Sequence, residues 1–157
     1  PRDFLIESSN GEALIKATSN WVILNQEGKP QLLQNYEDML HNQLDYEVVS
    51  HPATRIRPIK NMSTSDIYHP VVYSDIDMNR HANNSSYVLW IKKHFSFEFH
   101  QTHEISFLSL NYLEQTRSDD RYTIVQQEIA PNEFVASIIA EIDHAEVCRV
   151  LTRWQDA

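Results

Sequence analysis

The chain has 157 residues, 41% of them hydrophobic, which suffices for one packed domain and part of another. Its formal net charge of −9 disfavours a nucleic-acid partner, which would need a basic face on the protein. No apolar run approaches the roughly 20 residues of a membrane span, the two glycines argue against a glycine-rich phosphate loop, and the single cysteine excludes an internal disulfide.

No signal peptide is visible, so we expect a soluble, cytoplasmic protein. The first residue is Pro1, and we expect the natural N-terminus to lie upstream of it. The first third of the chain predicts two strands, residues 2–8 and 13–25, with a turn at Asn10 and Gly11. Leucine, tyrosine and methionine recur at helical spacing over residues 31–44, which predicts a short amphipathic helix.

Residues 48–69 contain two prolines and a Ser/Thr cluster, and we interpret them as a linker. After it, residues 70–77 predict a strand and residues 83–95 a helix. Four further strands are predicted over residues 104–116, 121–130, 133–142 and 146–154, with hairpin turns at Asn132–Glu133 and Asp143–His144. The helix carries five consecutive apolar residues, 87–91, so it should be buried. An antiparallel sheet wrapped around one central helix satisfies this pattern, which is the α+β hotdog fold.

Polar side chains crowd the loop directly before that helix. Asp75, Asp77, Asn79 and His81 have the same parity, so in an extended segment they could face one side. A carboxylate, an amide and an imidazole would then meet the free N–H groups of a helix N-terminus, which can stabilise an oxyanion. This equipment suits the hydrolysis of an acyl bond.

Asp, Asn and Ser are also the ordinary residues of turns and helix caps. We favour this structural interpretation for Asn83, Asn84 and Ser85, one of which should cap the helix while nearby backbone N–H groups serve the oxyanion. The strict spacing of Asp77, Asn79 and His81 favours function. The remaining histidines show no metal-ligand spacing, and we expect neither a metal nor a cofactor.

The stretch SDIDMNRHANNSSYVLWI, residues 74–91, resembles acyl-ACP thioesterases of the plant and bacterial fatty-acyl type. Their pattern is Ser-Asp-x-Asp-x-Asn-x-His-x-Asn-Asn followed by an aromatic residue and an apolar helix. Asp77, Asn79 and His81 match its catalytic element. The N-terminal residues RDF and GEALIKATSNWVILN are similar to the closing strands of the first of the family's two hotdogs. The resemblance implies an incomplete first hotdog over residues 1–47, the linker over 48–69, and a second, catalytic hotdog over 70–157.

The chain departs from the family pattern at one strand end. Aligning LNYLEQT on the family places Gln115 where members carry a glutamate, and Thr116 where plant members carry a cysteine. Cys148 lies on another strand and should be a buried structural thiol. The resemblance thus implies a water-based mechanism, in which His81 or Asp77 is the base and Gln115 positions the water.

The implied activity is hydrolysis of fatty acyl-ACP to free fatty acid and acyl carrier protein in fatty acid biosynthesis. Two alternatives stay open: a hotdog thioesterase acting on acyl-CoA, and a non-catalytic acyl-binding hotdog. Acyl carrier protein is acidic like this chain, so docking would need a local basic patch. Candidates are Arg55, Arg57 and Lys60 in the linker, or Lys92 and Lys93 at the helix C-terminus, where cations are also expected for structural reasons. A homodimer is a further expectation.

Overall fold

A computed structural model describes the chain in two compact units, Pro1–Thr54 and Arg55–Ala157. The described residues are 2–23, 25, 27, 29, 31, 48–49, 54–60, 62 and 67–157. The helix predicted over residues 31–44 lies outside this range. Among the described residues, no helix is long and apolar enough to cross a membrane.

The first unit contains an antiparallel hairpin of β1, Arg2–Glu7, and β2, Ala13–Ser19. Its turn closes through the N–H of Gly11, which donates to the Ser8 carbonyl at 3.0 Å. Gly11 has a φ of 84°, a left-handed conformation that glycine adopts without steric cost. The first strand and the turn are confirmed, whereas the second strand, expected over residues 13–25, ends at Ser19.

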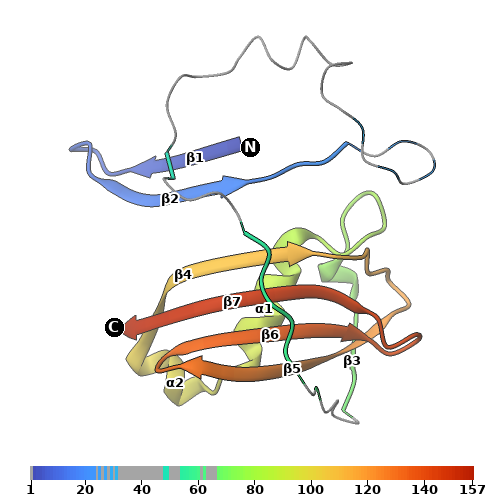
Figure 1. Cartoon of the computed structure of the whole chain (residues 1–157). Coiled ribbons are helices and arrows are strands. Elements are labelled where there is room, and N and C mark those ends of the chain that lie inside the picture. The colour runs from blue at the N-terminus through green and yellow to red at the C-terminus, as the bar shows by residue number, and fades with distance from the viewer. Residues whose placement is uncertain are drawn as a thin grey trace. The chain divides into compact units, whose positions relative to one another are not determined.

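The second unit is built on a five-stranded sheet with the order β3-β5-β6-β7-β4, in which all neighbours are antiparallel (Figure 1). The strands are β3, His69–Pro70; β4, His103–Tyr112; β5, Arg121–Ala130; β6, Glu133–Ala140; and β7, Glu146–Asp156. The four long strands match the predicted ones in number and order, but the strand expected over residues 104–116 ends at Tyr112, so Gln115 lies in the segment beyond β4. Asn132 and His144, at the predicted hairpin turns, have φ values of 58° and 57°.

Helix α1, Asn84–His94, packs on one face of this sheet. Tyr87, Trp90 and Ile91 are buried and join the inward side chains of the strands in one hydrophobic core. The Trp90 ring stacks on Tyr122 with 4.1 Å between centroids. The sequence predicted a helix buried all round. Leu89 is 50% exposed, so the helix buries only one side. The hotdog fold is confirmed.

Two local predictions were wrong. The strand expected over residues 70–77 is reduced to the two residues of β3, followed by a 3-10 turn at Tyr73–Asp75. The turn forms because the Asp75 carboxylate accepts the N–H of Val72 at 3.0 Å, an alternative to strand pairing. A short helix, α2, Phe97–Thr102, was not predicted. It begins where the Ser96 hydroxyl accepts the N–H of Phe99.

The outer face of the sheet carries a segment that we call the strap, residues 55–60. Ile56 is buried there: its N–H donates to Asn111 Oδ1 at 2.7 Å, and its carbonyl accepts from the Arg149 guanidinium at 2.7 Å. Arg149 lies between Cys148 and Val150, which face the core around α1, so it points to the opposite side. Figure 1 shows this segment crossing the strands on the side away from α1.

Candidate active site

The loop before α1 is a tight hairpin and not an extended segment. Ile76 pairs with Ala82, and the N–H of Asp77 donates to the His81 carbonyl at 2.9 Å. Arg80 reverses the chain at the tip with a φ of 64°. The predicted single polar face is therefore wrong in its geometry, because the loop folds back on itself.

The residues expected on one face lie in different surroundings. Asp75 is buried, Asp77 and His81 are half-buried, and Asn79 is exposed near the tip. Asp75 has a structural task that the sequence did not reveal: its carbonyl accepts the N–H of Asn83 at 2.7 Å and the hydroxyl of Ser86 at 3.0 Å. Asp75 thereby ties the loop to the start of α1.

The Asp77 carboxylate organises the loop. Its Oδ1 accepts the backbone N–H groups of Asn79 at 2.8 Å and His81 at 3.3 Å, and its Oδ2 lies 3.4 Å from the Asn79 amide nitrogen. Desolvation tends to raise the pKa of Asp77, but these hydrogen bonds and the positive charge that His81 can carry hold the pKa below its ordinary value. Asp77 is therefore an anion at neutral pH, adjacent to His81.

Helix α1 begins beside this anion. Asn83 is its N-cap, as predicted for one of three candidates, and its Oδ1 accepts the N–H of Ser85 at 3.0 Å. The N–H of Asn83 already donates to Asp75. Of the three N–H groups expected to serve an oxyanion, only that of Asn84 has no acceptor among the described residues. The backbone N–H of Asn84 is therefore the remaining candidate to donate a hydrogen bond to an oxyanion.

The segment with Gln115 runs antiparallel to the loop. His81 pairs with Arg117, and the N–H of Ala82 donates to the Thr116 carbonyl at 2.7 Å. Side chains alternate along such a pair, and burial follows the alternation: Ala82 and Thr116 are buried, whereas Gln115 and Arg117 are exposed. Gln115 and Arg117 therefore share a face with His81. Nothing in the sequence pointed to Arg117.

Cys148 is fully buried on β7, as predicted. Burial, together with the negative charge of Glu146, raises the pKa of the Cys148 thiol to about 12. A thiol in this environment is protonated at neutral pH and is no nucleophile. Within the described part of the chain, no three His, Cys, Asp or Glu side chains gather as a metal ion would require.

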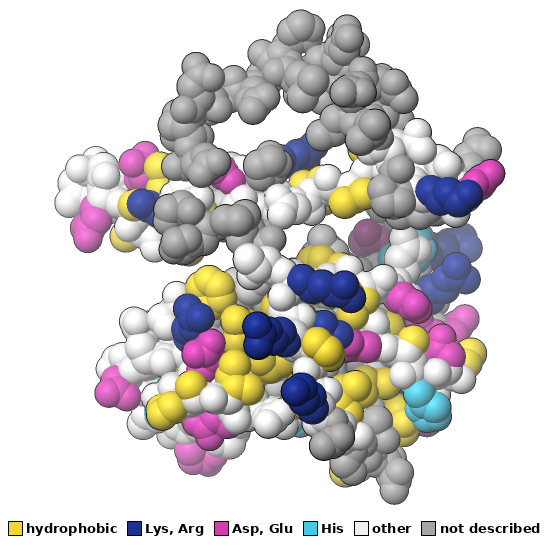
Figure 2. Space-filling model, viewed as in Figure 1, with side chains coloured by type: hydrophobic (Ala, Val, Ile, Leu, Met, Phe, Trp, Pro, Cys, Tyr) yellow, Lys and Arg dark blue, Asp and Glu magenta, His cyan; other side chains and the backbone are white. Residues whose placement is uncertain are grey.

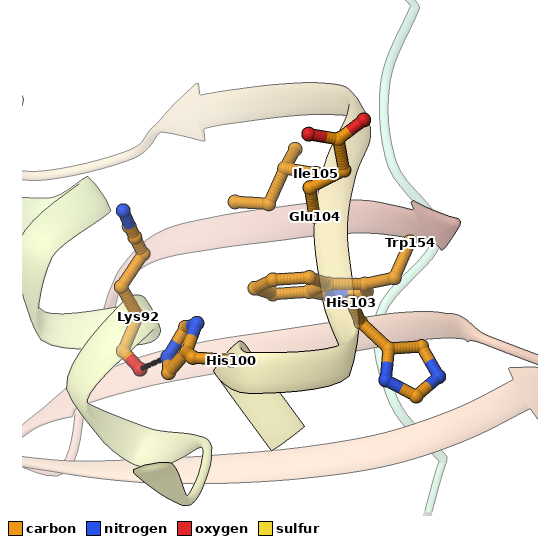
Figure 3. Close-up of a pocket in the computed structure, with 6 residues that line it drawn as sticks. All are labelled: Lys92, His100, His103, Glu104, Ile105 and Trp154. Atoms are coloured by element: carbon orange, nitrogen blue, oxygen red, sulfur yellow. Dashed lines mark hydrogen bonds between the residues drawn. The ribbon is translucent and has the colours of Figure 1, made fainter. Parts of the chain in front are cut away.

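A cavity of about 460 Å³ lies at the other end of α1. Its lining residues are Lys92, His100, His103, Glu104, Ile105 and Trp154 (Figure 3). His100 contacts the Lys92 carbonyl at 2.8 Å, and the ring of His103 points away from Lys92, so the basic groups do not converge on one point. Lys92 lies nine residues after Asn83 along α1, a rise of about 13 Å. It is no part of the candidate active site.

Comparison with known proteins identifies relatives. The family model for the acyl-ACP thioesterase C-terminal domain matches residues 58–156. The chain is 30% identical over 152 residues to an oleoyl-acyl carrier protein thioesterase of Arabidopsis thaliana, covering 87% of this chain and 40% of that protein. It is 32% identical over 120 residues to a palmitoyl-acyl carrier protein thioesterase of Cuphea hookeriana, covering 71% of this chain and 28% of that protein. The chain thus spans less than half the length of these relatives.

Solved structures agree with the fold. An acyl-ACP thioesterase from Bacteroides thetaiotaomicron superposes with a TM-score of 0.71 at 26% identity, covering 98% of this chain and 61% of that one. The 12:0-ACP thioesterase from Umbellularia californica gives a TM-score of 0.82 at 22% identity, with 99% and 62% covered. The family match covers more than half of the chain and includes the Asp77–His81 loop, α1 and the strand end with Gln115. The chain therefore belongs to the acyl-ACP thioesterase family, and residues 58–156 are its C-terminal domain.

Proposed function

We propose that the protein is a thioesterase that hydrolyses fatty acyl-ACP to free fatty acid and acyl carrier protein. The observation that carries this proposal is the meeting of three segments at the N-terminus of α1. Asp77 and His81 lie in the hairpin, the N–H of Asn84 is open to an acceptor, and Gln115 shares the face of His81. The family match and the names of the relatives support the same substrate class.

In the proposed reaction a water molecule attacks the thioester carbonyl carbon. His81, with the Asp77 anion beside it, takes a proton from this water, a step typically worth about 10²–10⁴-fold in rate. A C–O bond forms, the carbonyl oxygen becomes an oxyanion, and the N–H of Asn84 donates to it. The oxyanion then collapses, the C–S bond breaks, and the proton held by His81 passes to the departing thiolate. Gln115 can orient the water but cannot take its proton.

The acidic carrier protein would need a basic region on a chain whose net charge is −9. Figure 2 shows Lys and Arg side chains over the sheet face that carries the strap. Arg55, Arg57 and Lys60 of the strap are exposed, and Arg153 lies over the Phe107 ring at 4.7 Å. The strap cations support docking of an acidic partner, whereas Arg153 is already paired with Glu133 at 3.1 Å. The phosphates of acyl-CoA are anionic too, so the assay and not this surface distinguishes the two substrates. The cytoplasmic location and the homodimer remain predictions.

The test is a hydrolysis assay of the natural full-length protein with acyl-ACP and acyl-CoA of the same chain length. We expect turnover of acyl-ACP, and a loss of at least about 10²-fold for His81→Ala with the fold retained. His94→Ala, an exposed histidine at the far end of α1, is the matched control and should keep full activity. Turnover of acyl-CoA alone would show that the protein is a hotdog thioesterase acting on acyl-CoA. Binding of acyl chains with no turnover of either would make the protein an acyl-binding hotdog.

A further inference from the structure

A buried pair of hydroxyl groups lies directly behind the candidate active site. The phenol of Tyr87, on α1, donates to Thr116 Oγ1 at 3.0 Å. Thr116 is 1% exposed and Tyr87 is 3% exposed. Burial raises the pKa of Tyr87, and hydrogen bonding to Thr116 partly offsets this, so the phenol remains protonated and able to donate.

Thr116 faces away from the reacting groups. It occupies the inward position of the short pairing with the loop, together with Ala82, while Gln115 and Arg117 occupy outward positions. Its hydroxyl points into the core, where it accepts from Tyr87. It therefore lies on the opposite side of the segment from Gln115 and Arg117. A nucleophilic role for this hydroxyl is therefore inconsistent with the structure.

The pairing with the loop is short: among the described residues it consists of the His81–Arg117 bridge and the bond from the N–H of Ala82 to the Thr116 carbonyl. The side-chain period of an extended segment is two, so a shift by one residue would turn Gln115 inward and bring Glu114 to the face of His81. Both residues are exposed at the end of the strand region, and the N–H groups of Leu113 and Glu114 share one acceptor, the Val147 carbonyl. Backbone pairing at this point leaves the register weakly defined.

The hydrogen bond between Tyr87 and Thr116 favours one register of this pairing. With Thr116 inward, the buried phenol of Tyr87 has an acceptor at 3.0 Å, and a buried hydroxyl without a partner is costly. The same residue accepts the N–H of Ala82 through its carbonyl, so one residue connects α1, the catalytic loop and the strand end. We propose that Thr116, through Tyr87, is a positioning residue that fixes which side chain, Gln115 or Glu114, stands beside His81. This inference rests on the proposed thioesterase function.

The test compares Thr116→Val, which keeps the shape and removes the hydroxyl, with Thr116→Ser, which keeps the hydroxyl. We expect kcat for acyl-ACP to fall about tenfold in Thr116→Val and Tyr87→Phe with KM nearly unchanged, because misplacement by a fraction of an ångström is enough. Thr116→Ser should stay within about twofold of the wild type. Thr116→Val combined with Tyr87→Phe should be no worse than either single variant, because both remove the same bond.

A second readout does not depend on activity. Hydrogen exchange at the N–H of Ala82, which donates to the Thr116 carbonyl, should accelerate in Thr116→Val and Tyr87→Phe and stay unchanged in Thr116→Ser. The matched control is Thr123→Val, because Thr123 is also a buried threonine but lies elsewhere, on β5. This variant should leave hydrogen exchange at the N–H of Ala82 unchanged. Unchanged exchange at Ala82, or unchanged kcat in an active enzyme, would overturn the proposal. If the wild type turns over no thioester, the proposed function fails, and exchange at Ala82 alone decides whether Thr116 positions the strand end.

Discussion

Replacing Arg149 by methionine should strongly destabilise the second unit. The guanidinium donates through Nε to Glu146 Oε1 at 2.8 Å, through a second nitrogen to Glu146 Oε2, and through a third to the Ile56 carbonyl at 2.7 Å. The side chains of Arg149 and Glu146 are only 6% and 15% exposed. Removing one partner of a buried ion pair typically costs about 3–5 kcal/mol, because the other charge stays buried without compensation. The small remaining exposure of Glu146 and the Ser137 hydroxyl, which still donates to its carboxylate, place our expectation at the lower end, about 3 kcal/mol of unfolding free energy.

Urea denaturation followed by tryptophan fluorescence measures this loss. Trp90 and Trp154 are buried in the second unit, so their emission reports on it, whereas Trp21 is 61% exposed. Arg121→Met is the control: its pair with Glu141 has side chains 52% and 37% exposed, and such surface pairs are worth about 0–1 kcal/mol. A loss for Arg149→Met no larger than that of the control would refute the assignment of a buried, structurally essential ion pair.

Three further outcomes are expected. Gln115→Glu should raise the hydrolysis rate or add a titration to its pH profile while Glu114→Gln changes little, and the opposite pattern would place Glu114 beside the base. Cys148 should resist alkylation by iodoacetamide in the folded protein at pH 8, where a pKa of about 12 leaves about one thiol in ten thousand ionised, and fast labelling without denaturant would contradict its burial. Desolvation tends to raise the pKa of Asp77, but the hydrogen bonds from His81 and Asn79 hold it below its ordinary value, so the charge persists to lower pH than that of a free aspartate. An acid limb of kcat/KM that depends on Asp77 should therefore lie below the ordinary pKa of an aspartate and be absent from the residual activity of Asp77→Asn, and an unchanged limb in that variant would show that another group causes it.

Most of the second unit could be predicted from the sequence because its strands are short apolar-rich segments that end at turn residues. Asn132 and His144 take left-handed conformations where the hairpins were expected, and α1 begins at one of the predicted caps. These features depend on neighbouring residues only. The shape of the loop could not be predicted in the same way, because hydrogen bonds from nearby backbone N–H groups to the Asp75 and Asp77 carboxylates outweigh the strand preference of the segment.

The residues of the candidate site were proposed from the sequence, but their arrangement in a hairpin was not. The residue types at Asp77, Asn79 and His81 indicated the chemistry, and the resemblance to a family indicated Gln115. The pairing of Ala82 with Thr116 joins segments far apart in the chain, and no local pattern reveals it. Helix α2 was missed because alternating phenylalanines also fit a strand, and it forms because Phe99 packs on Phe95 and Trp154.

The left-handed conformation of Arg80 bears on how this loop can change in evolution. The chain has only two glycines and uses neither at this reversal, so the hydrogen bonds of Asp77 must hold Arg80 in a conformation that costs an ordinary residue about 1 kcal/mol or more. Glycine, asparagine or aspartate would fit there at least as well, whereas valine, isoleucine or threonine would open the hairpin. The charge at this position, one residue from His81, can therefore vary from positive to neutral to negative while the loop keeps its shape. A single substitution at this position can therefore change the electrostatic field beside His81, provided that the new side chain is unbranched at Cβ.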